Sequence, residues 1–357
     1  MKEKIDIRSL NEEKLQEFCL NHNLPKFRAK QITEWLWKKR ATSFGEMTSL
    51  SVAIRNLLSE YFNINPVTIH KGERSVDGTI KYSLRLYDKL LVEGVLIPSK
   101  KRITACISSQ VGCSLDCKFC ATGTLKLERN LSAAEMYDQV YILNDEALSN
   151  FGKPLSNIVF MGMGEPLLNY KPLLDSIALI TTEKGLGMSP KRITVSTVGV
   201  AKMIKKLADD MVRFNLAISL HTASDSKRNE LMPLNEKINL AELRESIRYY
   251  YDKTENRITY EYILFKDVND SIEDAKKLIQ FAKVSPCKIN LIEYNTVDGF
   301  SYEKSSNKTT DKFIKYLEEK NIIVNLRKSK GKDIDAACGQ LANKNGAIEL
   351  KDRTLKA

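Results

Sequence analysis

The chain has 357 residues, 43% of them hydrophobic, which is enough to bury a large core and is long for one ordinary domain but short for three. Lysine and arginine outnumber aspartate and glutamate by 56 to 45, and the net charge of +11 favours a polyanionic partner. No run of about eighteen uncharged apolar residues is present and Met1 is not followed by an apolar segment, so we expect a cytoplasmic protein that neither spans a membrane nor is exported.

A small helical accessory domain is predicted over residues 1–65, because apolar residues recur at helical spacing in segments such as 31–37. Basic and aromatic residues interleave over 26–40, an arrangement that suits contact with an RNA backbone and stacking on bases. In the alternative interpretation, Trp35 and Trp37 are simply the core of this domain, and the neighbouring cations are exposed.

A connecting β-hairpin is predicted over residues 66–98, where apolar and polar residues alternate. Beyond it, apolar and β-branched runs alternate with helix-length segments, a repetition that produces parallel strands joined by right-handed crossovers. The seven runs are 103–108, 157–163, 192–198, 215–220, 258–265, 288–294 and 322–327.

This alternation of strands and helices predicts an α/β fold, a partial (βα)6 TIM-like barrel of about six strand–helix units over residues 99–345. A C-terminal tail, 346–357, follows the barrel. Within the barrel, Ser132 and Glu135 have the spacing of a capping box, which predicts that the helix after the first strand begins there.

Three cysteines, Cys113, Cys117 and Cys120, follow the first predicted barrel strand with CxxxCxxC spacing. Soft thiolates select zinc or iron–sulfur centres, and a structural zinc ion requires a fourth ligand that this motif lacks. An iron–sulfur cluster with one open iron therefore fits the motif best. Zinc with Cys106 or His221 as a distant fourth ligand is the alternative.

Two further cysteines lie within or after predicted barrel strands. Cys106 is in the first barrel strand and Cys338 is in a loop of small residues after the last one. Because strand ends meet in a barrel, we expect both to face one cavity, where either acts as a nucleophile if cations such as Lys328, Lys330 or Lys332 stabilise its thiolate. The alternative is a pair of buried, inert cysteines.

Polar and small residues also end three other predicted strands. Gly164 and Glu165 follow the second strand, where a glycine lets the backbone approach a ligand and a carboxylate accepts hydrogen bonds from an ammonium group. Ser196 ends the third strand, and Ser219 and His221 end the fourth. Ligands of parallel α/β folds lie beyond the carboxyl ends of the strands, so these residues are candidates for contact, with a structural turn role as the alternative for each.

The cysteine motif, with Phe119 before its last cysteine, resembles that of the radical S-adenosylmethionine (SAM) superfamily. Several runs together resemble the dual-specificity adenine carbon-2 methyltransferases of 23S ribosomal RNA and transfer RNA, over essentially the whole chain. These runs are 106–113, 160–167, 195–199, 217–221 and 333–341. The resemblance implies a 4Fe–4S cluster held by Cys113, Cys117 and Cys120. It also implies contacts to SAM from Gly164, Glu165, Ser196, Ser219, Leu220, His221 and Asn295.

The resemblance further implies a radical mechanism, because carbon 2 of adenine is electrophilic and disfavours direct methyl transfer from a sulfonium. One SAM would methylate Cys338, and a second would be cleaved reductively to a radical that takes hydrogen from the S-methyl group. The resulting methylene radical would add to adenine, and Cys106 would help to break the protein–RNA bond, leaving a Cys106–Cys338 disulfide. Glu93 matches the position of a proton acceptor.

The partners implied are 23S rRNA and tRNA, with an electron donor such as flavodoxin or ferredoxin, and we expect a monomer. A sister family that methylates adenine carbon 8 has the same cysteines, but Val111 and Pro166 resemble the carbon-2 branch. A non-catalytic zinc-containing RNA-binding protein is the alternative from another class, suggested by the basic charge and the cysteines.

Overall fold

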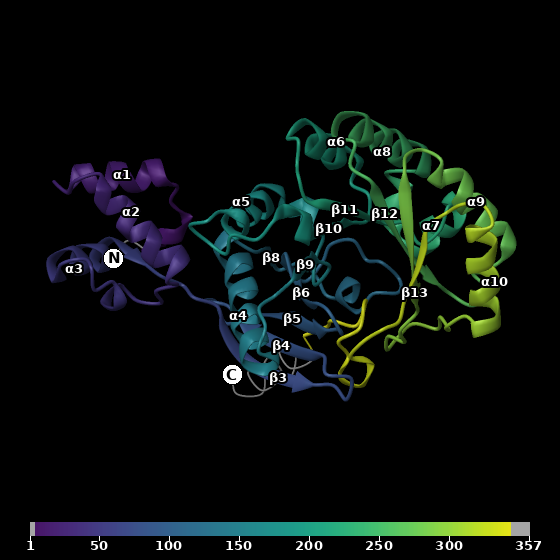
Figure 1. The fold of residues 1–357 in the computed structure, drawn as a ribbon, viewed down its shortest axis with the longest axis horizontal. Helices are drawn as coiled ribbons and strands as arrows, with labels where there is room; N and C mark the ends of the chain where they lie inside the picture. Colours follow the sequence, from purple (N-terminus) through teal and green to yellow (C-terminus); the bar gives the residue numbers. More distant parts are fainter. Residues whose placement is uncertain (1–3, 344–357) are drawn as a thin grey trace.

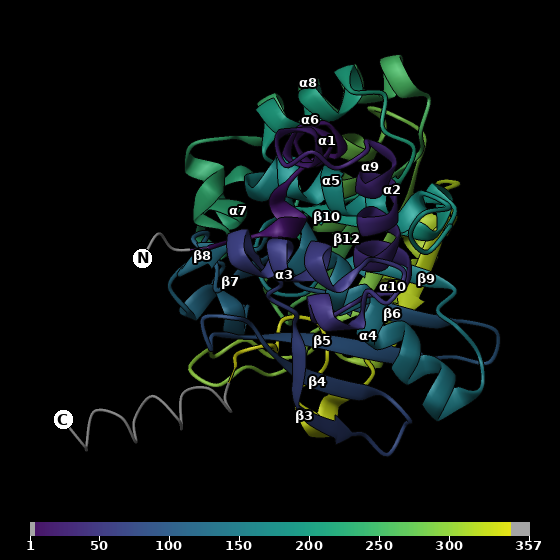
Figure 2. The same cartoon turned by 90° about the vertical axis from the view of Figure 1, so that its left-hand side faces the viewer.

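The computed structural model describes residues 4–343, so the predicted tail at 346–357 lies outside the described residues. Figure 1 shows a curved sheet with helices along its outer side and a separate helical lobe at the N-terminal end. Seen from the side of that lobe, the lobe lies in front of the sheet, and the first sheet strands run below it (Figure 2). No helix within residues 4–343 is both long enough and apolar enough to cross a membrane.

The N-terminal lobe is built on three α-helices, the second of which continues as a π-helical turn over Glu34–Lys38, and it is closed by a short pair of parallel strands. Its elements are β1 (Ile5–Asp6), α1 (Glu12–Asn21), α2 (Phe27–Thr33), α3 (Val52–Tyr61) and β2 (Phe62–Asn63). The side chain of Asn11 caps α1 and that of Ser51 caps α3, each by accepting a hydrogen bond from a backbone N–H of the first turn. The expected helical module is therefore present.

The two tryptophans of the lobe have different environments. Trp37 is buried and packs edge-to-face on Tyr137 of the barrel, with ring centres 5.5 Å apart. Trp35 is only partly buried, and the Lys39 ammonium lies 3.9 Å from the centre of its ring. The interpretation as core thus holds for Trp37, whereas Trp35 keeps an exposed face.

A single ten-stranded sheet forms the rest of the framework, in the order β14-β13-β12-β11-β10-β9-β6-β5-β4-β3. Its antiparallel strands are β3 (Thr68–Arg74), β4 (Ile80–Arg85) and β5 (Leu91–Pro98). Its parallel strands are β6 (Ile103–Ile107), β9 (Asn157–Phe160), β10 (Ile193–Thr197), β11 (Asn215–Ser219), β12 (Ile258–Leu264), β13 (Cys287–Glu293) and β14 (Val324–Arg327). Each of the seven runs expected from the sequence coincides with one parallel strand, and β13 begins one residue before its run.

Helices connect the parallel strands on the outside of the sheet (Figure 1). They are α4 (Ala133–Phe151), α5 (Tyr170–Thr181), α6 (Ala201–Asp209), α7 (Asp225–Leu231), α8 (Leu240–Thr254), α9 (Ile272–Ala282) and α10 (Asn307–Glu318). Strands β14 and β3 are the two edges of the sheet, so the barrel is open. The predicted partial (βα)6 barrel is confirmed, with a seventh parallel strand after the sixth unit.

The predicted β-hairpin over residues 66–98 is instead a three-stranded meander. Strand β5 pairs with the first barrel strand β6, with Val95 opposite Cys106, so the meander extends the barrel sheet. The predicted capping box is present at the start of α4, where the side chains and backbone N–H groups of Ser132 and Glu135 bond reciprocally.

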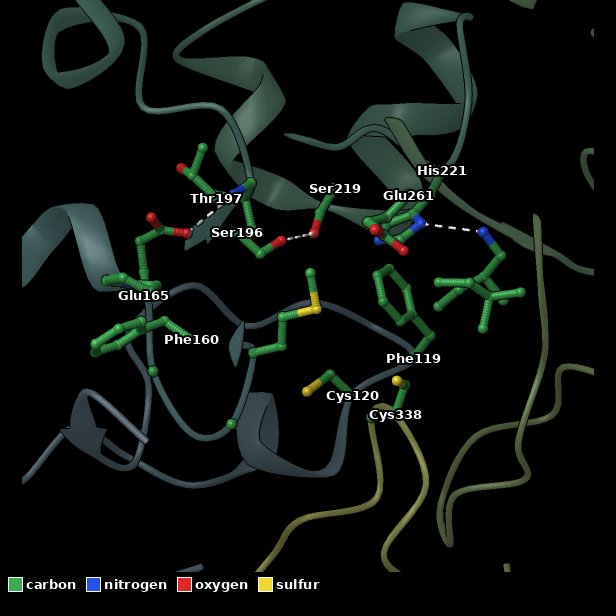
Figure 3. Close-up of a pocket in the computed structure, with 18 of the residues that line it drawn as sticks. Phe119, Cys120, Phe160, Glu165, Ser196, Thr197, Ser219, His221, Glu261 and Cys338 are labelled. Carbon is green, nitrogen blue, oxygen red and sulfur yellow. Dashed lines mark hydrogen bonds between the residues drawn. The ribbon is translucent and has the colours of Figure 1, made fainter. Parts of the chain in front are cut away.

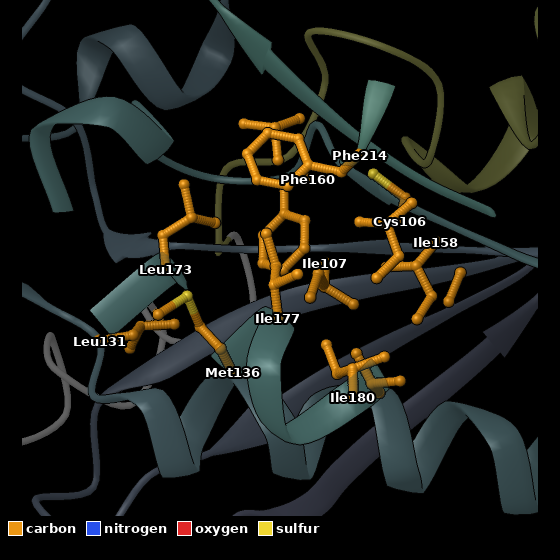
Figure 4. Packing of buried hydrophobic residues seen from close by; sticks show 14 of the residues in the cluster. Cys106, Ile107, Leu131, Met136, Ile158, Phe160, Leu173, Ile177, Ile180 and Phe214 are labelled. Atoms are coloured by element: carbon orange, nitrogen blue, oxygen red, sulfur yellow. The ribbon is translucent and has the colours of Figure 1, made fainter. Parts of the chain in front are cut away.

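The core between the sheet and its first helices is apolar (Figure 4). Met136 of α4 and Ile180 of α5 pack with Ile107 and Ile158 of the strands, and all four are fully buried. Successive side chains of a strand point to opposite faces, so Ile107 faces these helices while Cys106 faces the inside of the barrel.

Candidate active site

A cavity of about 150 Å³ opens at the carboxyl ends of the parallel strands. Every parallel strand, or the loop that follows it, contributes to its lining. Figure 3 shows lining residues from the ends of β9, β10, β11 and β12 together with Cys120 and Cys338. The polar and sulfur-bearing lining residues are Cys120, Met161, Glu165, Ser196, Thr197, Ser219, His221, Glu261, Arg327 and Cys338. This is the edge of a parallel sheet at which ligands bind.

A second, smaller cavity of about 70 Å³ adjoins the first, since Cys120, Arg327 and Cys338 line both. Cys106 lines this second cavity, so the structure brings Cys106 and Cys338 to one space. Cys338 is exposed and Cys106 is buried. Burial, with a smaller contribution from Cys338, raises the pKa of Cys106 to about 12, and the cationic Arg327 opposes that rise.

The three motif cysteines lie on one loop whose ends pair as a small antiparallel ladder, β7 (Gln110–Val111) with β8 (Arg129–Asn130). Gly112 starts the loop with φ of +77°, and a Cβ there would lie 2.0 Å from the carbonyl oxygen of Lys126. Only glycine therefore fits at this close approach of the two loop ends.

The thiols of Cys113, Cys117 and Cys120 are close enough to act on one another's ionisation. Burial is the largest cause that raises the pKa of each, and the other motif thiols add to the rise for Cys113 and Cys117. Within residues 4–343 no three His, Cys, Asp or Glu side chains are arranged as a ready metal site. The donor set is three neighbouring thiols, of which Cys120 lines the larger cavity, and it has the chemistry that an iron–sulfur cluster requires.

Glu165 is buried, and both of its carboxylate oxygens accept backbone hydrogen bonds. Oε1 accepts from the N–H of Leu167 at 3.0 Å and Oε2 from the N–H of Val198 at 2.9 Å. Burial nevertheless raises the pKa of Glu165 to about 7, against the effect of these bonds. Gly164 beside it has φ of +94°, and a Cβ there would overlap the side chain of Gln110.

The serines of two adjacent strands meet at the cavity, with Ser196 Oγ 3.3 Å from Ser219 Oγ (Figure 3). His221 contacts Phe119 edge-to-face at 4.9 Å between ring centres, and its Nδ1 accepts a hydrogen bond from the N–H of Ile263. Burial lowers the pKa of His221 to about 3, so its ring is neutral at physiological pH.

Two of the expected SAM contacts are absent from the described lining of both cavities. Leu220 is fully buried, and its carbonyl oxygen accepts a hydrogen bond from Nε of Arg228 at 3.3 Å. Asn295 donates its Nδ2 to the carbonyl oxygen of Cys338 at 3.3 Å, and its buried Oδ1 has no partner among the described residues. An unpartnered buried acceptor next to Cys338 suits a bound donor group.

Glu93 also lies outside the described lining of the two cavities. The residue is 1% exposed and lies in β5, where its carboxylate pairs with Lys81 at 3.6 Å. Its Oε2 accepts hydrogen bonds from the backbone N–H groups of Ala342 and Asn343.

Two of the three lysines expected to face the thiols, Lys330 and Lys332, pair with carboxylates elsewhere. Lys330 pairs with Asp77 at 3.8 Å and Lys332 with Glu293 at 3.1 Å, while Arg327 is the cation that lines both cavities. Sequence reasoning missed Arg327, although it ends the last predicted strand and strand ends carry the sites of such folds.

Arg228 is a second residue that sequence reasoning missed. It is fully buried on α7, and its guanidinium donates to the carbonyl oxygens of Val198 and Leu220 and to Oδ1 of Asn235. It thereby joins the ends of β10 and β11 beneath the cavity. Because Arg228 lies within a polar helix, its sequence context does not indicate that it is buried or that it joins two strand ends.

Comparisons with known proteins agree with this geometry. The fold, the cysteine loop and the strand-end cavity are those of a radical SAM enzyme, and the model of the radical SAM superfamily matches residues 107–282. The model of the ribosomal RNA large subunit methyltransferase N-terminal domain matches residues 5–64.

The chain belongs to the family of dual-specificity RNA methyltransferases called RlmN. It is 54% identical to the probable enzyme of this name from Christiangramia forsetii over 96% of this chain and 97% of that protein. It is 42% identical to the RlmN of Geobacter sulfurreducens, over 97% and 94% of the two chains. The crystal structure of a radical SAM methyltransferase from Sphaerobacter thermophilus is similar with a TM-score of 0.88 and 36% identity, covering 94% of this chain and 99% of that one. The expected family, fold class and enzyme class are thus confirmed.

Proposed function

We propose that this chain methylates carbon 2 of adenine in 23S rRNA and in tRNA, using two SAM molecules per turnover and Cys338 as the carrier of the methyl group. The observation that carries the proposal is that Cys106 and Cys338 line one cavity which adjoins the cavity of Cys120 and Glu165. A thiol carrier needs access both to a methyl donor and to its partner thiol, and the position of Cys338 supports both contacts.

A 4Fe–4S cluster on Cys113, Cys117 and Cys120, with SAM on its open iron, would supply the one-electron chemistry that an unreactive ring carbon requires. The remaining tasks fall to the chain itself. The backbone at Gly164 allows close approach of a ligand, and the carboxylate of Glu165 accepts hydrogen bonds from an ammonium group. Ser196 and Ser219 offer hydroxyl groups to the same ligand from adjacent strand ends.

Cys106 is proposed to resolve the bond between protein and RNA, forming the disulfide with Cys338 that an external reductant later opens. Arg327 lines both cavities and supplies positive charge near both thiols. Glu93 retains a place in this proposal as a proton acceptor, although in its described position it accepts hydrogen bonds only from the chain itself.

The lobe over residues 1–65 is proposed to bind the RNA substrate as an accessory domain of the barrel at 99–345, with 66–98 connecting the two. Lys26, Phe27 and Lys30 are exposed on α2 or just before it, where they can contact phosphates and bases. We further propose a cytoplasmic monomer that receives electrons from a flavodoxin or ferredoxin.

The decisive experiment is anaerobic incubation of the reconstituted enzyme with SAM, a reductant and either rRNA or tRNA, followed by mass mapping of the methylated nucleoside. We expect 2-methyladenosine, and the appearance of 8-methyladenosine instead would overturn the regiochemistry. Zinc in the purified protein with no iron would refute the cluster.

Substitutions test the two thiols separately. Cys338→Ala should abolish methylation, whereas Cys106→Ala should stall after addition and accumulate protein covalently bound to RNA, both read by gel and mass spectrometry. Cys287→Ala is a matched control, because Cys287 starts β13 at the amino end, opposite to the cavities, and should leave turnover unchanged. Full methylation by the Cys338 or Cys106 variant would contradict the assigned roles.

A further inference from the structure

The segment that carries Cys338 is held against the barrel by several elements. From the cysteine loop, Thr122 Oγ1 donates to the carbonyl oxygen of Leu341 at 2.6 Å, and the N–H of Ala121 donates to that of Gly339 at 2.7 Å. Asn295 holds the carbonyl oxygen of Cys338 itself. The thiol therefore owes its position to the docking of its own backbone.

A buried carboxylate completes this docking on the far side of Cys338. Oε2 of Glu93 accepts hydrogen bonds from the N–H of Ala342 at 2.9 Å and of Asn343 at 3.2 Å. The other oxygen lies 3.6 Å from the ammonium of Lys81, whose side chain is 7% exposed. Hydrogen bonds from backbone N–H groups to an ionised carboxylate are about twice as strong as neutral ones.

The bonds from Glu93 restrain Cys338 because few residues separate Cys338 from Ala342. Ala342 is four residues beyond Cys338, and four residues span at most about 14 Å when extended. Fixing the amides at Ala342 and Asn343 thus limits how far the Cys338 sulfur can move from the junction of the two cavities. The carbonyl of Glu93 also accepts from Oγ of Ser108, at the end of the strand that carries Cys106.

We propose that Glu93 is a positioning residue, which fastens the C-terminal segment so that the sulfur of Cys338 stays at the junction of the two cavities. The proposal rests on the function proposed above for Cys338, and it differs from proton acceptance in what it requires. A proton acceptor acts on the RNA step alone, whereas a fastening carboxylate acts on the tail before any RNA is bound.

The test uses hydrogen–deuterium exchange of the full-length enzyme, without RNA, read on peptides that contain Ala342 and Asn343. In Glu93→Ala, exchange of these amides should be about tenfold faster than in the wild type, because two charge-assisted hydrogen bonds are lost. Glu93→Gln keeps an oxygen that can accept both bonds and should restore most of the protection. The rate at which a labelled methyl group is transferred from SAM to Cys338 should be highest in the wild type, nearly as high in Glu93→Gln and lowest in Glu93→Ala.

Glu73→Gln is the matched control, because Glu73 also pairs with Lys81, at 3.3 Å, but has no contact with the tail in the described structure. In Glu73→Gln, the exchange rate of the Ala342 and Asn343 amides should stay within about twofold of the wild-type rate. If Glu93→Ala fails to fold, Glu93→Asp serves in its place, since its carboxylate is one methylene shorter and is drawn back from the N–H groups of Ala342 and Asn343. Wild-type exchange of these two amides in Glu93→Ala, or in Glu93→Asp in that case, would overturn the proposal. A wild-type enzyme that never methylates Cys338 would instead overturn the proposed function, and the exchange would still test the fastening.

Discussion

At the scale of single residues, the carboxyl group of Glu165 is governed by two opposing effects. Burial disfavours its charged form, while the N–H groups of Leu167 and Val198 stabilise that form. Burial is the larger effect, so the pKa rises to about 7 in the folded chain. The folded state therefore binds a proton more tightly than the unfolded state does between about pH 4.5 and pH 7.

This difference predicts the pH dependence of stability. In the chain without SAM, the contribution of Glu165 is fully present below pH 4.5 and is lost as the pH rises through 7, a total of about 3 kcal/mol in the free energy of unfolding. Glu165→Gln, which is neutral throughout, should therefore gain stability relative to the wild type between pH 5 and pH 8. Urea denaturation at both pH values measures this, and a constant difference between the two proteins would contradict the prediction.

The sequence predicted some residues of the site but not others. Ser196, Ser219 and Glu165 were found because the carboxyl ends of parallel strands converge whatever the details of packing. The choice of Arg327 over Lys330 as the cation near the thiols depends on which acidic partners lie within reach. Those partners are far away in sequence, as Asp77 is from Lys330, so the sequence alone could not show the choice.

At the scale of elements, α4 depends on the capping box at its start. Ser132 Oγ accepts from the N–H of Glu135 at 3.2 Å, and the carboxylate of Glu135 accepts from the N–H of Ser132 at 2.8 Å. Arg129 pairs with the same carboxylate, which links the helix start to β8 and hence to the end of the cysteine loop.

Ser132→Ala should lower the free energy of unfolding by about 1 kcal/mol, because one backbone N–H of the first turn loses its acceptor. Ser132→Thr keeps a hydroxyl group at the cap and is the matched control. Chemical denaturation of the three proteins measures the effect. Equal midpoints for Ala and Thr would show that the hydroxyl contributes nothing.

Elements with a strong pattern were predicted and those without one were missed. All seven parallel strands show as apolar runs in the sequence, although β14 at the edge of the sheet has no buried residue, and the capping box has a fixed spacing. Strand β3, by contrast, is an edge strand whose residues are mostly exposed and polar, so it has no apolar alternation, and a meander was taken for a hairpin. Strands β7 and β8 have two residues each and are too short to show any period.

At the scale of the whole molecule, a buried ion pair joins the N-terminal lobe to the barrel. Nη1 of Arg8 lies 2.8 Å from Oδ2 of Asp138, and both side chains are nearly inaccessible. The same oxygen accepts from the N–H of Val67, where the chain leaves the lobe for the sheet. These groups are 71 to 130 residues apart in sequence, so no local pattern could reveal the junction.

Replacing Asp138 with alanine tests whether this junction couples the lobe to catalysis. The change leaves the buried N–H of Val67 unpaired and removes one of the two carboxylates of Arg8, so the free energy of unfolding should fall by about 3 kcal/mol. Asp145→Ala is the matched control, since Asp145 is exposed on the same helix and should cost far less. Urea denaturation compares the two variants, and equal midpoints would contradict the prediction.

The same pair of variants separates RNA capture from chemistry. If the lobe delivers RNA to the barrel, Asp138→Ala should raise the RNA concentration needed for half-maximal methylation by about tenfold. The reason is that a loosened lobe no longer holds its basic side chains at a fixed position relative to the cavity. Methyl transfer from SAM to Cys338 should keep its rate, since that step uses the barrel alone. If RNA methylation and methyl transfer to Cys338 were impaired equally, the substitution at Asp138 would act on the barrel rather than on the lobe.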